Sequence, residues 1–171
     1  MVRVNYIRQA IQFAVYVLIQ IPLLYKSVLF NQAFAFFYLG FLLFIPYGVS
    51  RSFSMLIAFF TGLLIDVFSS TPGIHASACV LIVFIKDYWF IASVGDPEDE
   101  INIGFDSIGL WGLVKYAFPL IFVHHFMLFI IENGGFILIG SLLVKSILSG
   151  LYSLVVIISI GYLIAPKTQR K

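Results

Sequence analysis

The sequence predicts an all-α polytopic membrane protein with six transmembrane helices and with both chain ends in the cytoplasm (N-in/C-in). Apolar residues make up 61% of the chain and charged residues 11%, and the mean hydropathy is +1.06. Soluble domains are about half apolar and about a quarter charged. Lipid offers the backbone no hydrogen-bond partner, so apolar runs long enough to cross a membrane are expected to be helices.

Six apolar runs are expected to form the helices. They cover residues 7–25, 33–49, 52–68, 74–92, 113–131 and 136–165. The first run lacks an Ala-x-Ala cleavage site, so we expect an uncleaved helix with a bend near Pro22. The last run is longer than a bilayer requires, so it must tilt, break near Gly150 or extend beyond the membrane. Residues 1–171 then form a single domain.

The distribution of Lys and Arg predicts the orientation, because cytoplasmic segments carry the excess of these residues. With the N-terminus inside, the outer side carries only Lys26, and Lys145 falls within a helix. The cytoplasmic side then carries Arg3, Arg8, Arg51, Lys86, Lys115, Lys167, Arg170 and Lys171. The loop 93–112 is also cytoplasmic, and its apolar second half is expected either to lie on the membrane surface or to be solvated. A net charge of +2 does not favour a nucleic-acid partner.

The third predicted helix carries a stripe of small and polar residues at a spacing of four: Ser54, Ala58, Gly62 and Asp66. Small residues at this spacing let a second helix approach closely, so Asp66 is expected on a packing face. This face is expected either to dock a partner helix or to pack against the next helix of the hairpin. A turn at Pro72 and Gly73 leads into the next helix, which opens with His75. An Asp66–His75 pair is expected to pin this hairpin, and a catalytic or proton-relay role is the weaker alternative.

Three further ionisable residues are candidates for a polar site, because such groups are costly at membrane depth. His125 and Glu132 lie seven residues apart on the fifth helix, and Lys145 lies on the sixth. Asp66, His125 and Lys145 form one predicted polar layer, which is either a packing network or the floor of a ligand cavity open to the outside. Asp66 and Glu132 are the expected carboxylate partners for Lys145. A metal needs three or four convergent ligands, so neither a metal nor another cofactor is predicted.

Enzyme signatures are missing from the sequence. It contains no Gly-x-Ser-x-Gly elbow, no His-Glu-x-x-His zinc helix and no phosphate-binding loop. A non-enzymatic protein is therefore predicted, and an intramembrane hydrolase that uses His125 and Asp66 to activate water is the weaker alternative.

The segment 58–68 (AFFTGLLIDVF), followed by 71–76 (TPGIHA), resembles the signature of the MreD family of rod shape-determining membrane proteins. The segment 124–132, with its His-His pair and Glu132, also resembles one branch of that family. The chain length and the six-helix plan agree with this resemblance.

The resemblance implies a scaffold of the bacterial cell-elongation complex in the cytoplasmic (inner) membrane. Its direct partner would be an MreC-type bitopic protein, and MreB, RodA and a class B transpeptidase would be indirect partners in lateral peptidoglycan synthesis. The family's fold is similar to that of the substrate-binding subunits of energy-coupling-factor transporters. A vitamin-transporter subunit is therefore the alternative function.

Overall fold

The computed structural model describes residues 6–24, 28–29, 33–97 and 102–164, and this part of the chain is mostly helical. The elements are α1 (Tyr6–Phe13), the π-helical turn η1 (Ala14–Leu18), α2 (Ile19–Leu24), β1 (Val28–Leu29), β2 (Ala33–Phe34), α3 (Tyr38–Leu43), α4 (Arg51–Ser69), α5 (Ile74–Ser93), α6 (Phe105–Glu132) and α7 (Ile139–Ile164). The strands β1 and β2 form a two-residue antiparallel pair, the one exception to the all-α prediction in the described part.

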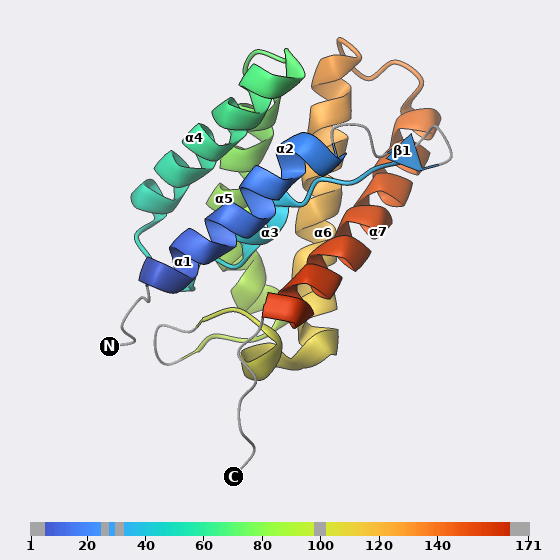
Figure 1. Cartoon of the computed structure of the whole chain (residues 1–171). Coiled ribbons are helices and arrows are strands. Elements are labelled where there is room, and N and C mark those ends of the chain that lie inside the picture. Colours follow the sequence, from blue (N-terminus) through green and yellow to red (C-terminus); the bar gives the residue numbers. More distant parts are fainter. Residues whose placement is uncertain (1–5, 25–27, 30–32, 98–101, 165–171) are drawn as a thin grey trace.

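Four helices are long and apolar enough to cross a membrane, and they are α4, α5, most of α6 and α7. They pack in chain order, each against the next (Figure 1). The α4–α5 and α6–α7 turns lie at one end of the bundle, here called the turn end. The start of α1, the end of α7 and the α5–α6 connection lie at the other end (Figure 1). The structure therefore supports a membrane protein, while six spans and the orientation stay predictions.

The predicted first helix is one helical run with a π-helical interruption. α1, η1 and α2 follow one another from Tyr6 to Leu24, and the apolar part of this run, Gln9–Pro22, is shorter than the four long helices. Pro22 has no backbone N–H to donate to the carbonyl of Leu18, where η1 ends. The proline thus explains the local change in helical pitch, while the bend near Pro22 stays a prediction.

The predicted spanning helix over 33–49 is not present. This segment instead consists of β2, an extended stretch, the six-residue helix α3 and a chain reversal that ends before α4. All six residues of α3 are buried, and the helix contacts α1, η1, α5 and α7. Its apolar residues face neighbouring helices on every side, and this explains why the segment resembles a span in sequence.

The non-helical stretch 33–37 lies between α2 and α7, where side chains supply the hydrogen-bond partners that a helix would provide internally. Gln20 of α2 donates to the carbonyl of Ala35 and accepts from the N–H of Phe37. On α7, Ser149 and Ser153 accept from the N–H groups of Phe34 and Phe36, at 3.0 and 2.9 Å. Non-helical backbone at membrane depth requires such protein partners.

The last two helices differ from the prediction at their starts. α6 begins at Phe105, eight residues before the predicted start, and bends at Gly109, where φ is 66°. Beside this bend Leu110 and Trp111 are exposed. α7 begins at Ile139 rather than at residue 136. It runs through Gly150 without interruption, so the predicted alternative of a break near Gly150 is wrong.

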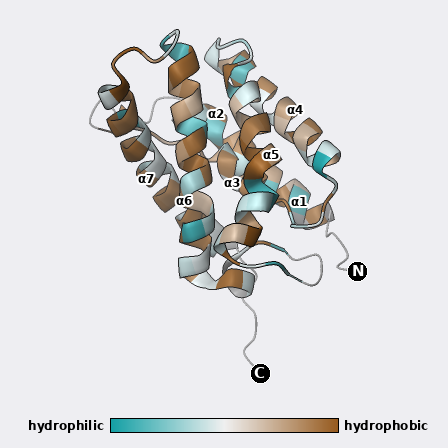
Figure 2. Cartoon of the chain, turned by 180° about the vertical axis from the view of Figure 1, so that it is seen from behind, coloured by the Kyte–Doolittle hydropathy of each residue, from teal (hydrophilic) through white to brown (hydrophobic). Residues whose placement is uncertain are grey.

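Apolar side chains also cover much of the bundle's outside. Most of each long helix is apolar in Figure 2, with the strongly hydrophilic residues mainly toward the helix ends. On α4 the outward face is lined by Phe53, Leu56, Phe60, Leu63 and Val67. In a soluble protein such a face would be unusual, but it suits a lipid environment or a partner helix.

Candidate functional site

Asp66 fastens the α4–α5 hairpin through backbone groups. Its Oδ1 accepts from the hydroxyl of Thr71 and from the N–H of His75, both at 2.9 Å, and its Oδ2 accepts from the N–H of Ala76 at 3.0 Å. The first N–H groups of a helix have no partner within the helix, and a carboxylate there also interacts favourably with the helix dipole. Asp66 thus caps α5 from within α4 and is itself 3% exposed.

The small-residue stripe on α4 is the surface on which α5 packs. Ser54, Ala58, Gly62 and Asp66 are all buried, and α5 is the element that packs most extensively against α4. A Cβ atom on Gly62 would lie 2.5 Å from the Cα of Ala76 and 2.7 Å from the carbonyl oxygen of His75. The stripe is therefore occupied within the chain, and of its two predicted uses it serves hairpin packing.

The turn between the two helices needs residues with special backbone conformations. Ser70 has φ of 55° and donates its N–H to the carbonyl of Asp66, so it closes α4. Gly73 has φ of 82°, where a side chain would be strained, and it directly precedes α5. Pro72 lies between them and cannot continue a helix from α4. The predicted turn residues therefore fix the short distance between Asp66 and the start of α5.

The His75 side chain does not pair with Asp66 as predicted, since only its backbone N–H does. Its Nδ1 lies 2.7 Å from the hydroxyl of Tyr38, and the same hydroxyl lies 3.0 Å from Nε2 of His124. A hydroxyl has one hydrogen, so Tyr38 donates to one ring and accepts from the other. The Sγ of Cys79 lies 3.9 Å from Nε2 of His124. All four residues are buried, so α3 is joined to α5 and α6 by a polar cluster.

His125 belongs to a second polar cluster, between α6 and α7. Its Nδ1 donates to the carbonyl of Ile121 at 2.8 Å, so in a neutral ring Nε2 is the acceptor. The hydroxyl of Ser153, 3.2 Å from Nε2, then donates to His125 while accepting from the N–H of Phe36. The Phe36 ring stacks on His125 with 5.0 Å between centroids. His125 therefore helps to hold the non-helical stretch 33–37 in place.

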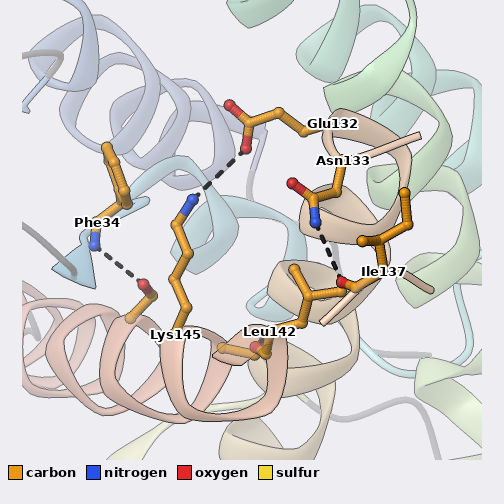
Figure 3. A network of polar contacts seen from close by, with 8 residues as sticks. Phe34, Glu132, Asn133, Ile137, Leu142 and Lys145 are labelled. Carbon is orange, nitrogen blue, oxygen red and sulfur yellow. Dashed lines mark hydrogen bonds and ion pairs between the residues drawn. The ribbon is translucent and has the colours of Figure 1, made fainter. Parts of the chain in front are cut away.

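Lys145 pairs with Glu132 and not with Asp66. Its Nζ lies 3.7 Å from Oε2 of Glu132, and Figure 3 shows the side chain reaching from α7 toward the end of α6. Nζ also lies 4.1 Å from the ring centroid of Phe129 and 5.0 Å from that of Phe34. Because α7 begins at Ile139, Lys145 is only six residues into the helix, and helical side chains lean toward the N-terminus. The ammonium group thus reaches the turn end.

A partly open cavity of about 300 Å³ lies at the turn end, beside these groups. Residues of α2, β2, α4, α5 and α6 and of the turns between them line it. They are Gln20, Ile21, Phe34, Phe36, Ile65, Phe68, Ser69, Thr71, Ile74, His75, Leu128, Phe129 and Glu132. Small-molecule sites are typically concave and mostly apolar, with a few polar groups, and begin at about this size.

The predicted single layer of Asp66, His125 and Lys145 is therefore three separate arrangements. Asp66 holds the hairpin, His125 holds the stretch 33–37, and Lys145 faces Glu132 at the cavity rim. Within the described residues no group of three or more His, Cys, Asp or Glu side chains could hold a metal ion.

Sequence reasoning missed Tyr38, Gln20 and Ser153. Tyr38 was placed inside a spanning helix that does not form, and Gln20 was not singled out although it is a polar residue in an apolar run. Ser153 continues a spacing of three and four from Ser146 and Ser149, so this α7 serine series was the available signal.

No protein-family model, curated protein or solved structure matches the chain.

Proposed function

We propose that the protein is a non-enzymatic scaffold of the bacterial cell-elongation complex, in the cytoplasmic membrane. In this proposal it binds an MreC-type bitopic protein and so supports lateral peptidoglycan synthesis. The observation that carries the proposal is the structural role of the segment 58–76. The resemblance to the MreD family rests on this segment. Its Gly62, Asp66 and Gly73 are committed to building one tight hairpin, which suits a structural signature better than a reactive one.

The outward face of α4 is the favoured partner surface in this proposal. It carries Phe53, Phe60 and Val67 among its exposed residues, and the Asp66 cap on the opposite face holds α4 against α5. A single spanning helix of a bitopic partner buries apolar and aromatic side chains against such a face by close packing. Membrane lipid covers the face where no partner does.

The test is co-purification with the MreC-type protein encoded by the same genome, after co-expression and extraction in mild detergent. The proposal expects recovery of a complex, with Phe60→Ala plus Val67→Ala lowering the yield. Leu148→Ala plus Leu151→Ala, an exposed pair on α7, is the matched control and should leave the yield unchanged. Equal recovery of an unrelated bitopic protein, or no recovery of the MreC-type protein, would refute the scaffold.

The cavity at the turn end favours a second candidate, the substrate-binding subunit of a vitamin transporter. Such a subunit would hold a small molecule in a cavity bounded by residues such as Gln20, His75 and Glu132. Mass spectrometry of the purified protein discriminates the two functions. A stoichiometric small molecule without a wall-synthesis partner supports the transporter subunit, whereas a stable partner without a ligand supports the scaffold.

A further inference from the structure

The cavity at the turn end has a distinctive charge pattern. Among the described residues that line it, Glu132 is the one acidic side chain, and none is a lysine or an arginine. Phe34, Phe36, Phe68 and Phe129 supply four aromatic rings. An anion would find no cationic partner in this lining. An aromatic wall with a carboxylate at the rim instead favours a positively charged group.

Two of these rings and the carboxylate already contact a cation. Nζ of Lys145 lies 4.1 Å from the ring centroid of Phe129, 5.0 Å from that of Phe34 and 3.7 Å from Oε2 of Glu132. Each of these three partners also lines the cavity, whereas Lys145 does not. The ammonium of Lys145 therefore occupies a cation site at the cavity rim from the side of α7 (Figure 3).

Lys145 is not locked into this place. Its side chain is 33% exposed and that of Glu132 is 53% exposed. Ion pairs with this much exposure are worth about 0–1 kcal/mol, and the four-carbon stem of a lysine turns easily. A competing cation can thus displace Lys145, because its partly exposed ammonium group can turn away from Glu132 into the solvent-accessible space at the turn end.

The geometry points to a binding site for a small organic cation, with Lys145 as its built-in competitor. The ligand's ammonium group takes the place of Nζ between Glu132 and the Phe129 ring. Its apolar or aromatic body enters the cavity beside Phe36 and Leu128. The inference does not depend on the scaffold role, and it names the ligand class for the cavity that the second candidate function would use.

His75 supplies a second contact in the same cavity. It lines the cavity and is 4% exposed. Its Nδ1 is engaged by Tyr38, while its Nε2 makes no hydrogen bond within the described part of the chain. That ring nitrogen is available to a polar group on the ligand, at a point away from the charged rim. A cation that also carries a hydroxyl or amide group would use both ends.

The test uses three probes of similar size: 4-fluorobenzyltrimethylammonium, 4-fluorobenzyl alcohol and 4-fluorobenzoate. Their ¹⁹F line widths are measured against the full-length protein in nanodiscs of zwitterionic lipid, with empty nanodiscs as the reference. We expect saturable broadening of the cation alone. Glu132→Gln should weaken its binding by about tenfold, and Lys145→Gln should strengthen it by a similar factor, because the internal competitor is gone.

The decisive result is that the two substitutions change the affinity for the cation in opposite directions. If Lys145→Gln weakens binding as Glu132→Gln does, the ion pair merely shapes the site and the competitor role is refuted. Equal binding of all three probes, or no binding of the cation to either the native protein or Lys145→Gln, overturns the site itself.

If one of the two charge variants folds poorly, a variant that fills the cavity provides an independent test of the site. Ile21→Trp places bulk in the cavity wall, and it should abolish cation binding while the elution volume in size exclusion stays native. Undiminished binding to Ile21→Trp would place the cation elsewhere and overturn the inference. Co-purification with the MreC-type partner is measured separately, so failure of either proposal is seen independently.

Discussion

α4 and α5 approach each other closely at Gly62, so Gly62→Ala tests the hairpin directly. The added Cβ would lie 2.5 Å from Cα and 2.6 Å from N of Ala76. Ordinary contact begins at 3.4 Å, so the helices must separate locally by about 0.9 Å. The atoms in the way are backbone atoms, and no rotamer change relieves them.

The expected cost follows from three terms. Overpacking costs about 1–3 kcal/mol, while replacing glycine by alanine within a helix returns about 1 kcal/mol. The same displacement stretches the bonds from Asp66 to the N–H groups of His75 and Ala76, which contribute about 1 kcal/mol each. With both bonds lost, these terms give a net loss of about 2–4 kcal/mol in the free energy of unfolding.

The assay is equilibrium unfolding of the purified protein in mild detergent by SDS titration, followed by circular dichroism. Gly150→Ala is the matched control, because a Cβ there meets its nearest atom at 3.7 Å, and its stability should be unchanged or higher. Adding Ala76→Gly should not rescue Gly62→Ala, since that change leaves the clashing backbone in place. Native stability of Gly62→Ala, or rescue by Ala76→Gly, would refute the backbone contact.

Three further substitutions test the polar contacts by the same unfolding assay. Asp66→Asn should cost about 1–3 kcal/mol. An asparagine has one acceptor oxygen, so its NH₂ group must face either the N–H of Ala76 or the two donors that bind Oδ1; unchanged stability would contradict the cap. Tyr38→Phe should cost a similar amount, since two histidine nitrogens lose the hydroxyl between them; a stabilised variant would contradict that bridge. Ser153→Ala should cost about 1–3 kcal/mol, because the N–H of Phe36 and the Nε2 of His125 lose their partner. Ser159→Ala, whose hydroxyl bonds only within its own helix, should change little, and equal effects of the two serine variants would count against the interhelical role.

The hairpin was the most predictable part of the candidate site. The spacing of four from Ser54 to Asp66 predicted a packing face, and the Pro72–Gly73 turn predicted the reversal, because both are local features of the chain. The partners of the Asp66 carboxylate were predicted less well. The carboxylate binds backbone N–H groups of α5 and not the expected His75 ring. The position of these N–H groups depends on how closely α5 approaches Gly62.

The segment 33–49 shows the opposite case. Its apolar composition predicted a spanning helix, since burial by lipid and burial by protein demand the same residues. The structure folds it inside the bundle, where Gln20, Ser149 and Ser153 bind its backbone. Those partners lie up to 119 residues away in sequence, so no local pattern indicates them.

The sequence by itself determined the class of protein, because hydropathy, helix length and the placement of small residues are local quantities set by composition and spacing. Only the tertiary structure decided which polar groups meet. Lys145 faces Glu132 because α7 begins at Ile139, and His75 turns to Tyr38 because α3 lies within the bundle. The physical reason is range: hydrogen bonds and ion pairs act over about 3–4 Å, and only packing brings groups from distant helices that close.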